Sequence, residues 1–367
     1  MAEPERVAQI IGKWLGGGVE AVVMNYYRHI DRTKFQFDFI CDADSTNIPY
    51  EEIESLGGRV IIVPPYQKLP AYLKELRRVF KVGGYKIVHS HINTLSVFPL
   101  YAAKKAGVRV RIAHSHSTSN KKEWKKNLLK NALRPFSKKY ANEYACCSEV
   151  AGRYLFGNCF YEGGKVKLVK NAIDVGKFSF SSEIREKKRD ELGIKEDTFV
   201  VGHVGRFVAQ KNHSYLIDIF AEIHEKNPDS VLLLAGQGPL QEEIREKVKT
   251  LGLENCVRFL GQRNDIPELY QAFDTVVLPS LYEGLVVVLV EAQCAGLPCF
   301  CSTDVSPETK ISDRLSFISL SETPEFWAEK IVAGSKIVRS DTRKDIAANG
   351  YDIEVAAKEW TAWYGSL

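Results

Sequence analysis

The sequence predicts an α/β protein made of two doubly wound domains, each a parallel sheet covered by helices on both faces. Three observations support this fold class. The chain has 367 residues, which is long for a single hydrophobic core. Short β-rich runs alternate with segments of helical periodicity, as in parallel sheets with crossover helices. The same alternation starts again in the second half, near residue 175.

Strands are expected where β-branched and aromatic residues cluster between turn signals. In the first half the expected strands are 6–11, 35–41, 59–63, 86–91, 108–114 and 144–147, with helices at 19–30 and 69–81, and a strand leading into a connector over 165–178. In the second half the expected strands are 198–205, 230–236, 257–261, 274–280, 298–302 and 315–320, and the expected helices are 212–226, 239–251, 265–272 and 325–338.

These elements divide the chain into three parts. An N-terminal Rossmann-like domain is expected over 1–174 and a C-terminal Rossmann-like domain over 175–343. Residues 344–367 have no third core to join, so they are expected to form a helix that packs back on the first domain. Because such sheets bind ligands beyond the carboxyl ends of their strands, and in clefts between domains, the loops after strands are the candidate sites.

Composition narrows the functional classes. An apolar fraction of 45% and a charged fraction of 26% are ordinary for a globular protein, and a net charge of +4 is too small to require nucleic acid. The start MAEPERVAQ has no apolar core of a signal peptide, and no run reaches the ~18 apolar residues of a membrane span. Eight scattered cysteines are typical of a reduced, cytoplasmic setting.

Two loops after first strands could hold phosphate. KWLGGGVE (13–20) precedes a helix, and Gly17 and Gly18 would let backbone N–H groups approach an anion. The alternative is a tight turn without a ligand. In GRFVAQK (205–211), Arg206 and Lys211 lie five residues apart just before a helix, which suits a diphosphate; the alternative is two solvated cations.

Two glutamates bracket an apolar run in EGLVVVLVE (283–291). Propensity favours a strand for this run, because β-branched residues dominate it. Position favours a helix over about 285–295, because the run follows a strand and Gly296-Leu297-Pro298 is a stop signal. Glu283 is then expected in the loop before the helix and Glu291 about two turns inside it.

The combination of GG-x-E in GGVE, GR-x4-K in GRFVAQK and E-x7-E in EGLVVVLVE resembles the retaining family 4 glycosyltransferases of the GT-B fold. The phrases VHSHINTLSVFPLYAAKKAGV and KNAIDVGKF are similar to bacterial capsule and exopolysaccharide members. The resemblance runs from about residue 6 to about residue 305, and it implies two Rossmann-like domains with a cleft between them.

In the second domain the resemblance implies a donor site. Arg206 and Lys211 would hold the donor diphosphate and stabilise it as leaving group. Glu291 would accept hydrogen bonds from the ribose, and Arg263 would lie near the base. Glu283, with Gly284 and Leu285 beside it, would position the donor sugar. The family usually has Pro after E-G-L, whereas this chain has Val286, so a looser loop at Glu283 is expected.

In the first domain the resemblance implies that Gly17 and Gly18 let the domain close on the phosphates. His116 best fits the family's histidine at a strand end beside the reaction centre, and His114 is the competing alignment. The pairs His89/His91 and His114/His116 each place two imidazoles on one face of a strand. Zinc binding, a structural or polar lining role, and contact with substrate are the alternatives for them; no Asp, Glu or Cys accompanies them at matching spacing, which disfavours zinc.

The implied reaction moves a hexose or N-acetylhexosamine from a nucleotide-diphosphate sugar, expected to be a UDP-sugar, to a saccharide or polyprenyl-diphosphate-linked acceptor, with retention, in surface polysaccharide synthesis. No metal and no other cofactor is expected, because Arg206, Lys211 and helix N-termini can neutralise the departing diphosphate. The D-x-D of Asp42 and Asp44 is interpreted as a turn, and metal binding is the less favoured alternative for it. Alternatives are a nucleotide-sugar 2-epimerase, whose family lacks the combined motifs, and a non-catalytic sugar-nucleotide or membrane-binding protein.

A basic stretch, 121–139, carries eight Lys or Arg and one Glu, with apolar residues at helical spacing and a possible break at Pro135. A solvated surface helix is one interpretation. Docking on the anionic inner face of a membrane, near a lipid-linked acceptor, is the other. Nucleic acid is not expected as a partner, because nothing else in the chain resembles a nucleic-acid module.

Overall fold

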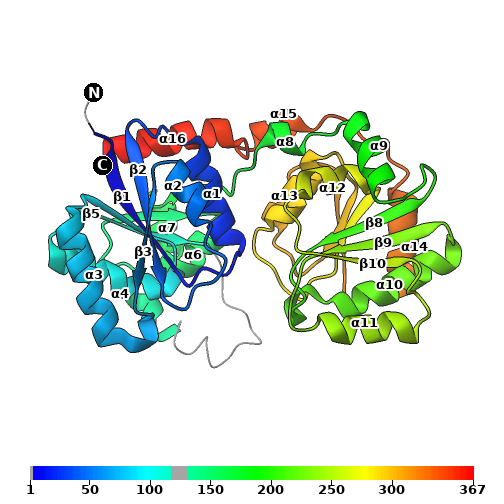
Figure 1. Ribbon diagram of the computed structural model, residues 1–367, viewed down its shortest axis with the longest axis horizontal. Coiled ribbons are helices and arrows are strands. Elements are labelled where there is room, and N and C mark those ends of the chain that lie inside the picture. The colour runs from blue at the N-terminus through cyan, green and yellow to red at the C-terminus, as the bar shows by residue number, and fades with distance from the viewer. Residues whose placement is uncertain (1–2, 117–130) are drawn as a thin grey trace. The chain divides into compact units, whose positions relative to one another are not determined.

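A computed structural model describes residues 3–116 and 131–367, which form two compact units (Figure 1). Unit 1 runs to Ala172 and resumes at Asp352–Leu367, and unit 2 is Ile173–Tyr351. Each unit contains one parallel sheet with helices on both faces, so the predicted fold class is confirmed.

Unit 1 has its sheet in the order β3-β2-β1-β4-β5-β6-β7. Its strands are β1 (Glu5–Gly12), β2 (Phe35–Asp42), β3 (Arg59–Val63), β4 (Ile87–Ser90), β5 (Val110–Ser115), β6 (Glu143–Cys146) and β7 (Lys167–Leu168). Its helices are α1 (Gly18–His29), α2 (Tyr50–Ser55), α3 (Leu69–Gly83), α4 (Val97–Ala106), α6 (Glu149–Phe156), α7 (Asn158–Glu162) and α16 (Ile353–Ser366), with 3-10 turns at Tyr66–Lys68, Asn93–Ser96 and Arg134–Phe136.

Unit 2 has its sheet in the order β10-β9-β8-β11-β12-β13. Its strands are β8 (Phe199–Val204), β9 (Ser230–Ala235), β10 (Val257–Gly261), β11 (Thr275–Leu278), β12 (Cys299–Ser302) and β13 (Leu315–Ile318). Its helices are α8 (Val175–Phe178), α9 (Ser182–Glu191), α10 (His213–Lys226), α11 (Gln241–Thr250), α12 (Ile266–Ala272), α13 (Val287–Cys294), α14 (Pro324–Gly334) and α15 (Arg343–Ala348), with 3-10 turns at Ala209–Lys211 and Pro307–Thr309.

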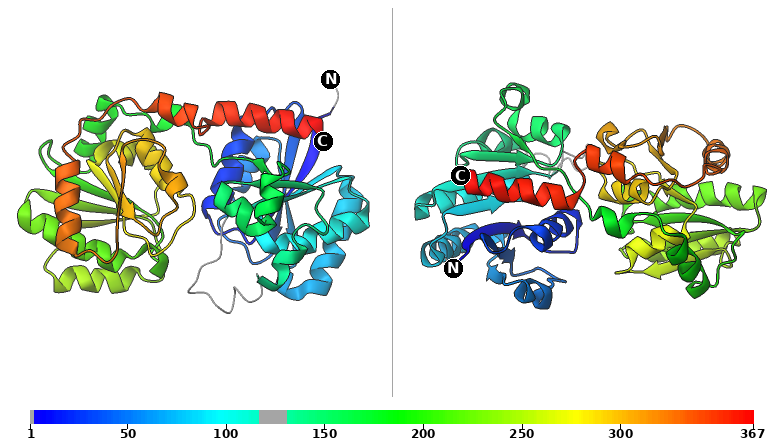
Figure 2. Two further views of the ribbon diagram at one scale, coloured as in Figure 1. Left: turned by 180° about the vertical axis from the view of Figure 1, so that it is seen from behind. Right: turned by 90° about the horizontal axis from the view of Figure 1, so that it is seen from above.

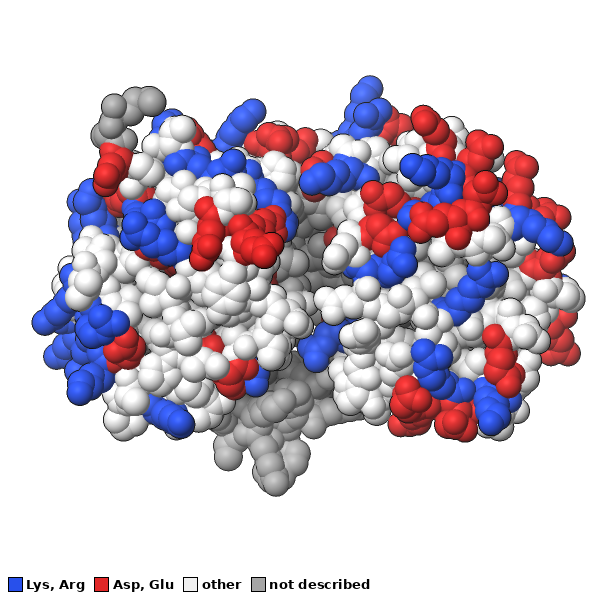
Figure 3. All heavy atoms as spheres, in the orientation of Figure 1, with Lys and Arg blue, Asp and Glu red and all other residues white. Residues whose placement is uncertain are grey.

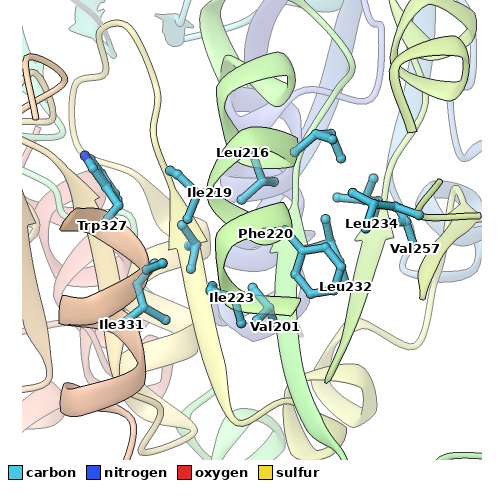
Figure 4. Close-up of a cluster of buried hydrophobic side chains, with 14 of the residues drawn as sticks. Val201, Leu216, Ile219, Phe220, Ile223, Leu232, Leu234, Val257, Trp327 and Ile331 are labelled. Carbon is cyan, nitrogen blue, oxygen red and sulfur yellow. The ribbon is translucent and has the colours of Figure 1, made fainter. Parts of the chain in front are cut away.

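The strands of unit 2 are buried on both faces, which explains their continuous apolar runs. Successive side chains of a strand point to opposite faces. Val201 accordingly joins the cluster under α10 and α14, shown in Figure 4 with Phe220 and Trp327, whereas Val200 joins the cluster under α12 and α13. Two separate cores, one on each face of the sheet, therefore fix where its strands end.

The apolar run between Glu283 and Glu291, for which both a strand and a helix were considered, forms helix α13. It spans Val287–Cys294, inside the predicted 285–295, and it is apolar around most of its circumference. Gly296 follows in the left-handed region at φ +68°, and the Leu297 N–H donates to the Ala292 carbonyl, which closes the helix. Burial between the sheet and α8 and α15 outweighs the strand propensity of valine here.

The last helix, α16, belongs to unit 1, whereas the first part of the expected segment 344–367 lies in α15 and belongs to unit 2. It begins after Asp352, whose carboxylate accepts from the Glu354 N–H, and it packs against α1 (Figure 2). Trp360 and Tyr26 meet at 4.2 Å between ring centroids, and both side chains are buried. Over residues 3–116 and 131–367, the helices are all too short or too polar to span a bilayer.

Candidate functional site

The loops after β8 and β9 in unit 2 are packed backbone to backbone. The Phe207 N–H donates to the Gln237 carbonyl, and the Leu240 N–H donates to the Phe207 carbonyl. A Cβ on Gly236 would lie 2.0 Å from the Gly205 carbonyl oxygen, so only glycine fits there. The two glycine turns seen in the sequence therefore form one layered surface at the carboxyl edge of the sheet.

Lys211 and Glu283 meet at this edge. The Lys211 Nζ lies 2.7 Å from the Glu283 Oε1, and the side chains are 16% and 12% exposed. Their loops are joined by backbone: the Leu281 N–H donates to the Gln210 carbonyl at 2.8 Å, and the Asn212 amide donates to the Pro279 carbonyl. Lys211 and Glu283, to which the family resemblance assigns the leaving group and the sugar, are thus in direct contact although 72 residues separate them in the chain.

The backbone of Glu283 is held on its other side by the loop after β12. Its N–H donates to the Asp304 carbonyl, and its carbonyl accepts from the Ser306 N–H, both at 3.1 Å. Val286, buried at the helix start, donates its N–H to the Thr309 Oγ1 at 3.5 Å. A proline there would have no N–H to donate. Val286 is therefore tied to a neighbouring loop at the point where a looser loop was expected.

Glu291 projects from α13 toward Tyr270 of α12. The Tyr270 hydroxyl donates to the Glu291 Oε2 at 2.9 Å. Burial raises the pKa of Glu291 to about 7, and the Tyr270 hydrogen bond opposes that rise. Glu291 therefore has comparable neutral and charged populations near physiological pH. Its partner Tyr270 was not predicted, because no motif spacing in the sequence connects the two residues.

The two predicted arginines of unit 2 differ in their surroundings. Arg206 is exposed in the loop after β8, and among the described residues its guanidinium has no hydrogen-bond or ion-pair partner. Arg263, after β10, donates from its Nε to the Asp265 Oδ1 at 2.7 Å, and Asp265 also accepts from Lys188 at 2.8 Å. Arg206 thus lies on the same loop as Lys211, whereas Arg263 is engaged in a separate ion-pair network.

Two histidines of unit 2 were not singled out from the sequence. His203 lies one residue before the end of β8, and its Nδ1 donates to the Val277 carbonyl at 2.8 Å. His213 begins α10 and stacks on Phe207 with centroids 4.1 Å apart. The Nε2 atoms of both are buried without a partner among the described residues. Burial lowers their pKa, to about 4 for His203 and about 2 for His213, and the charge of Lys211 contributes.

In unit 1, the glycine loop after β1 is closed by Glu20. The Glu20 carboxylate accepts from the Leu15 N–H at 3.0 Å, across the turn that contains Gly16 at φ +72°. Gly17 caps α1, and Gly18 begins it with open space where a Cβ would point. The glutamate of GG-x-E therefore shapes the loop, which leaves the glycine backbone at the N-terminus of a 12-residue helix.

The D-x-D motif lies in the loop after β2 and forms contacts typical of a turn. Asp44 pairs with Lys13 at 2.8 Å, and the Ser45 N–H donates to the Asp42 carbonyl. Burial raises the pKa of Asp42 to about 6, so burial disfavours the charged form of this carboxyl. These contacts agree with the turn interpretation of the motif.

The four strand-end histidines of unit 1 form one cluster. His89 and His91 stack at 4.2 Å between centroids, and His114 and His116 at 3.9 Å. His114 is buried, whereas His116 follows β5 and is partly exposed, with its N–H donated to the Asn93 Oδ1 at 2.7 Å. Of the two candidates for a substrate-contacting histidine, His116 is the more exposed.

Metal ligation and hydrogen bonding compete for these histidines. Ligand nitrogens of His89, His91 and His114 lie within 4.8 Å of one another, a spacing compatible with a metal ion. Yet both nitrogens of His89 are hydrogen-bonded, to Tyr364 and His114, and both nitrogens of His91 are too, to His116 and Gln9. Both nitrogens of two of the three histidines are therefore already hydrogen-bonded, which favours the polar interpretation over zinc.

The basic stretch 121–139 lies mostly outside the described residues, which resume at 131. Pro135 sits in the 3-10 turn Arg134–Phe136, where the break in the helix was expected. Phe136 is 45% exposed beside Lys139, whose ammonium lies 5.4 Å from the ring centroid.

Comparisons with known proteins agree with this architecture. A family model described as Glycosyltransferase Family 4 matches residues 16–177, and one described as Glycosyl transferases group 1 matches residues 184–351. The Bacillus subtilis (strain 168) protein EpsF is 38% identical over 359 residues, which cover 95% of this chain and 94% of EpsF.

More distant similarities cover most of the chain. An Escherichia coli UDP-Gal:alpha-D-GlcNAc-diphosphoundecaprenol alpha-1,3-galactosyltransferase is 29% identical over 296 residues, 78% of this chain and 76% of that enzyme. The crystal structure of Anabaena Alr3699/HepE in complex with UDP and glucose superimposes with a TM-score of 0.81 at 20% identity, over 98% of this chain and 99% of that one. The chain therefore belongs to glycosyltransferase family 4 and is a glycosyltransferase of the GT-B fold.

Proposed function

We propose that this glycosyltransferase transfers a hexose or N-acetylhexosamine from a UDP-sugar to a saccharide or lipid-linked oligosaccharide, with retention and without a metal ion. The observation that carries the proposal is the Lys211–Glu283 ion pair at the carboxyl edge of the unit 2 sheet. It joins a cation suited to a departing diphosphate to a carboxylate suited to sugar hydroxyls, on two loops fixed by backbone hydrogen bonds.

The choice of UDP and of a lipid-linked acceptor rests on relatives. The name of the Escherichia coli enzyme specifies UDP-galactose and a diphosphoundecaprenol-linked GlcNAc, and HepE has been crystallised with UDP-glucose. In this chain, Glu291 would accept from the ribose hydroxyls, oriented by Tyr270. Such an acceptor role requires the ionised carboxylate, so nucleotide binding would draw the Glu291 pKa below its value of about 7.

We propose that the anomeric configuration is retained because the acceptor attacks the same face of the donor sugar from which the diphosphate departs. The acceptor oxygen forms a bond to the sugar's anomeric carbon as the bond from that carbon to the diphosphate oxygen breaks. The acceptor proton passes to the departing phosphate oxygen, so no protein nucleophile is needed. Arg206 and Lys211 would stabilise the charge that gathers on the diphosphate, which is the role a metal ion has in other glycosyltransferases.

Docking on an anionic membrane is proposed for unit 1, near a lipid-linked acceptor. Besides the stretch 121–139, cations gather where α3 and α4 lie (Figure 3), and one surface hollow there is lined by Lys74, Arg77, Arg78, Lys81 and Lys105. Co-sedimentation with phosphatidylglycerol vesicles in low salt tests this proposal. Binding should weaken in high salt and after Lys-to-Glu changes at 74, 81 and 105. Equal binding to phosphatidylcholine vesicles would argue against it.

The donor is tested by thermal shift with UDP, GDP, ADP and TDP, each with EDTA and with magnesium. A ligand that binds only the folded state stabilises it by about 2.7 kcal/mol at a hundredfold excess over its dissociation constant. A shift with UDP in EDTA is expected. A shift only with magnesium would overturn metal independence, and a shift with another nucleotide would overturn the choice of UDP.

Transfer itself is tested with a panel of UDP-hexoses and UDP-N-acetylhexosamines, with proton NMR of the product's anomeric signal. Glu283→Gln should abolish transfer and leave UDP binding within a few-fold of wild type, because the carboxylate is assigned to the sugar. Full activity of Glu283→Gln would remove Glu283 from the site. A product of inverted configuration would contradict retention.

A further inference from the structure

Six side chains of unit 1 form one continuous hydrogen-bonded chain. They come from the ends of β1, β4 and β5 and from α16, and both strand-end histidine pairs are included. The contacts are His116 Nε2 to His91 Nδ1 at 2.9 Å, His91 Nε2 to Gln9 Oε1 at 2.8 Å, Gln9 Nε2 to the Tyr364 hydroxyl at 3.0 Å, Tyr364 hydroxyl to His89 Nδ1 at 2.6 Å, and His89 Nε2 to His114 Nδ1 at 3.0 Å.

The orientation of the Gln9 amide sets the protons on one arm of this chain. Its NH2 group donates to the Tyr364 oxygen, which leaves the Tyr364 proton to be donated to the His89 Nδ1. His89 then carries its own proton on Nε2 and donates it to the His114 Nδ1. This arm ends at the His114 Nε2, a buried atom with no partner among the described residues.

The other arm leads to the accessible histidine. The Gln9 Oε1 can only accept, so the His91 Nε2 carries a proton. The His91 Nδ1 is then an acceptor, and the His116 Nε2 must donate to it. His116 is thereby left with a bare Nδ1, for which the described residues supply no partner. Its backbone is anchored as well, through the N–H donated to Asn93.

The four histidines of this hydrogen-bonded series are neutral, so their tautomers decide which nitrogens donate and which accept. Burial lowers the pKa of His116 to about 3 and lowers the pKa of His89, His91 and His114 well below the usual value. A neutral imidazole has one donor and one acceptor nitrogen, and the partner of one nitrogen decides the role of the other.

We infer that Gln9 and Tyr364 are positioning residues that hold His116 in one tautomer, with Nδ1 presented as a hydrogen-bond acceptor at the carboxyl end of β5. A sugar hydroxyl is the class of donor that such an atom would receive; this last part rests on the proposed function. The tautomer itself does not, because it follows from the orientation of the Gln9 amide within unit 1. Reversal of the Gln9 amide would reverse every proton in the chain.

Long-range proton–nitrogen NMR correlations on the full-length protein with 15N-labelled histidine test the tautomer. The His116 signals are identified by their loss in a His116→Asn variant. Wild type is expected to show a protonated Nε2 and a bare Nδ1 at His116. A protonated Nδ1, or an equal mixture of the two forms, would overturn the inference, and this spectrum needs no variant that alters the core.

Gln9→Met and Tyr364→Phe test the positioning role. Gln9→Met removes the acceptor for His91, and Tyr364→Phe removes the oxygen that orients the amide, so both should give mixed tautomers at His116. Phe35→Leu is the matched control, because Phe35 packs on Tyr364 with centroids 5.5 Å apart and makes no side-chain hydrogen bond. It should lower thermal stability and leave the His116 tautomer unchanged. An unchanged tautomer in Gln9→Met would contradict the positioning role.

Kinetics separate this inference from the proposed function. With whichever UDP-sugar supports transfer, Gln9→Met should lower kcat about tenfold, the size of one lost hydrogen bond in the transition state, with UDP affinity unchanged. An unchanged kcat would show that the hydrogen-bonded side chains of unit 1 have no role in transfer. If wild type transfers no sugar from any UDP donor, the proposed function fails, while the tautomer assignment is still decided by the wild-type spectrum.

Discussion

Lys211 is one of the two residues of unit 2 that we propose hold the donor diphosphate. Its ammonium is mostly buried and faces one carboxylate, so donors remain for a second anion. Lys211→Ala should weaken UDP binding by about 10- to 100-fold, since a charge-assisted hydrogen bond contributes about 1.5–3 kcal/mol. Isothermal titration with UDP measures this loss. Lys195→Ala, an exposed lysine of the same unit, is the control, and equal losses in the two variants would contradict the assignment.

Glu291 should make stability depend on pH. Its pKa is about 7 in the folded state and near 4.5 when unfolded, so the folded state binds the proton more tightly. The stabilisation is fully present below pH 4.5 and is lost as pH rises through 7, by at most about 3 kcal/mol. Urea unfolding of wild type and Glu291→Gln measures it. The glutamine variant should lose less stability over this interval, and parallel profiles would contradict the shifted pKa.

At the scale of the element, α13 depends on its glycine stop. A Cβ on Gly296 would lie 2.6 Å from the Ser340 carbonyl oxygen, and the residue has φ +68°. Gly296→Ala should therefore destabilise unit 2 by more than the ~1–2 kcal/mol of a left-handed alanine. Gly252→Ala is matched to it, with φ +68° and open space around the Cβ. Equal losses in the two variants would show that the Ser340 contact contributes nothing.

Helices and strands were predictable where their hydrophobic periodicity was clear or where glycine and proline marked their ends. All of the expected strands are present, and α13 was found from Gly296 and from its place after a strand, against its β propensity. Helix α4 was missed, because VFPLYAAKKA carries a proline and apolar residues around most of its surface, which hides the amphipathic signal. The helices α2, α6, α7, α8 and α9, each of ten residues or fewer, were missed as well.

The candidate site was predictable only as separate loops. Motif spacing located Lys211 and Glu283, but nothing in the sequence shows that 2.7 Å separates their charged atoms. The tyrosine partners of Glu291 and His89 could not be predicted for a related reason. Tyr270 lies 21 residues from Glu291, and Tyr364 lies 275 residues from His89, so no local pattern connects them.

At the scale of the whole molecule, unit 1 is completed by the far end of the chain. Trp360 is buried against Tyr26, and Tyr364 packs beside Phe35. Trp360→Ala should destabilise unit 1 by about 3–5 kcal/mol, the usual cost of removing a buried tryptophan side chain. Calorimetry with and without UDP should assign the lowered transition to unit 1, with the UDP-stabilised transition of unit 2 unmoved. A shift of both transitions by the same amount would mean that the units unfold together.

Because α16 belongs to unit 1, unit 1 can be completed only at the end of translation. During translation the strands of unit 1 emerge first, yet Tyr364, the partner of His89 and Gln9, leaves the ribosome only after all of unit 2. At ordinary rates of synthesis that interval is roughly 10–40 s. The nascent chain must carry a half-covered sheet for that time, so a chain that ended directly after residue 351 would have a complete unit 2 joined to an unfinished unit 1.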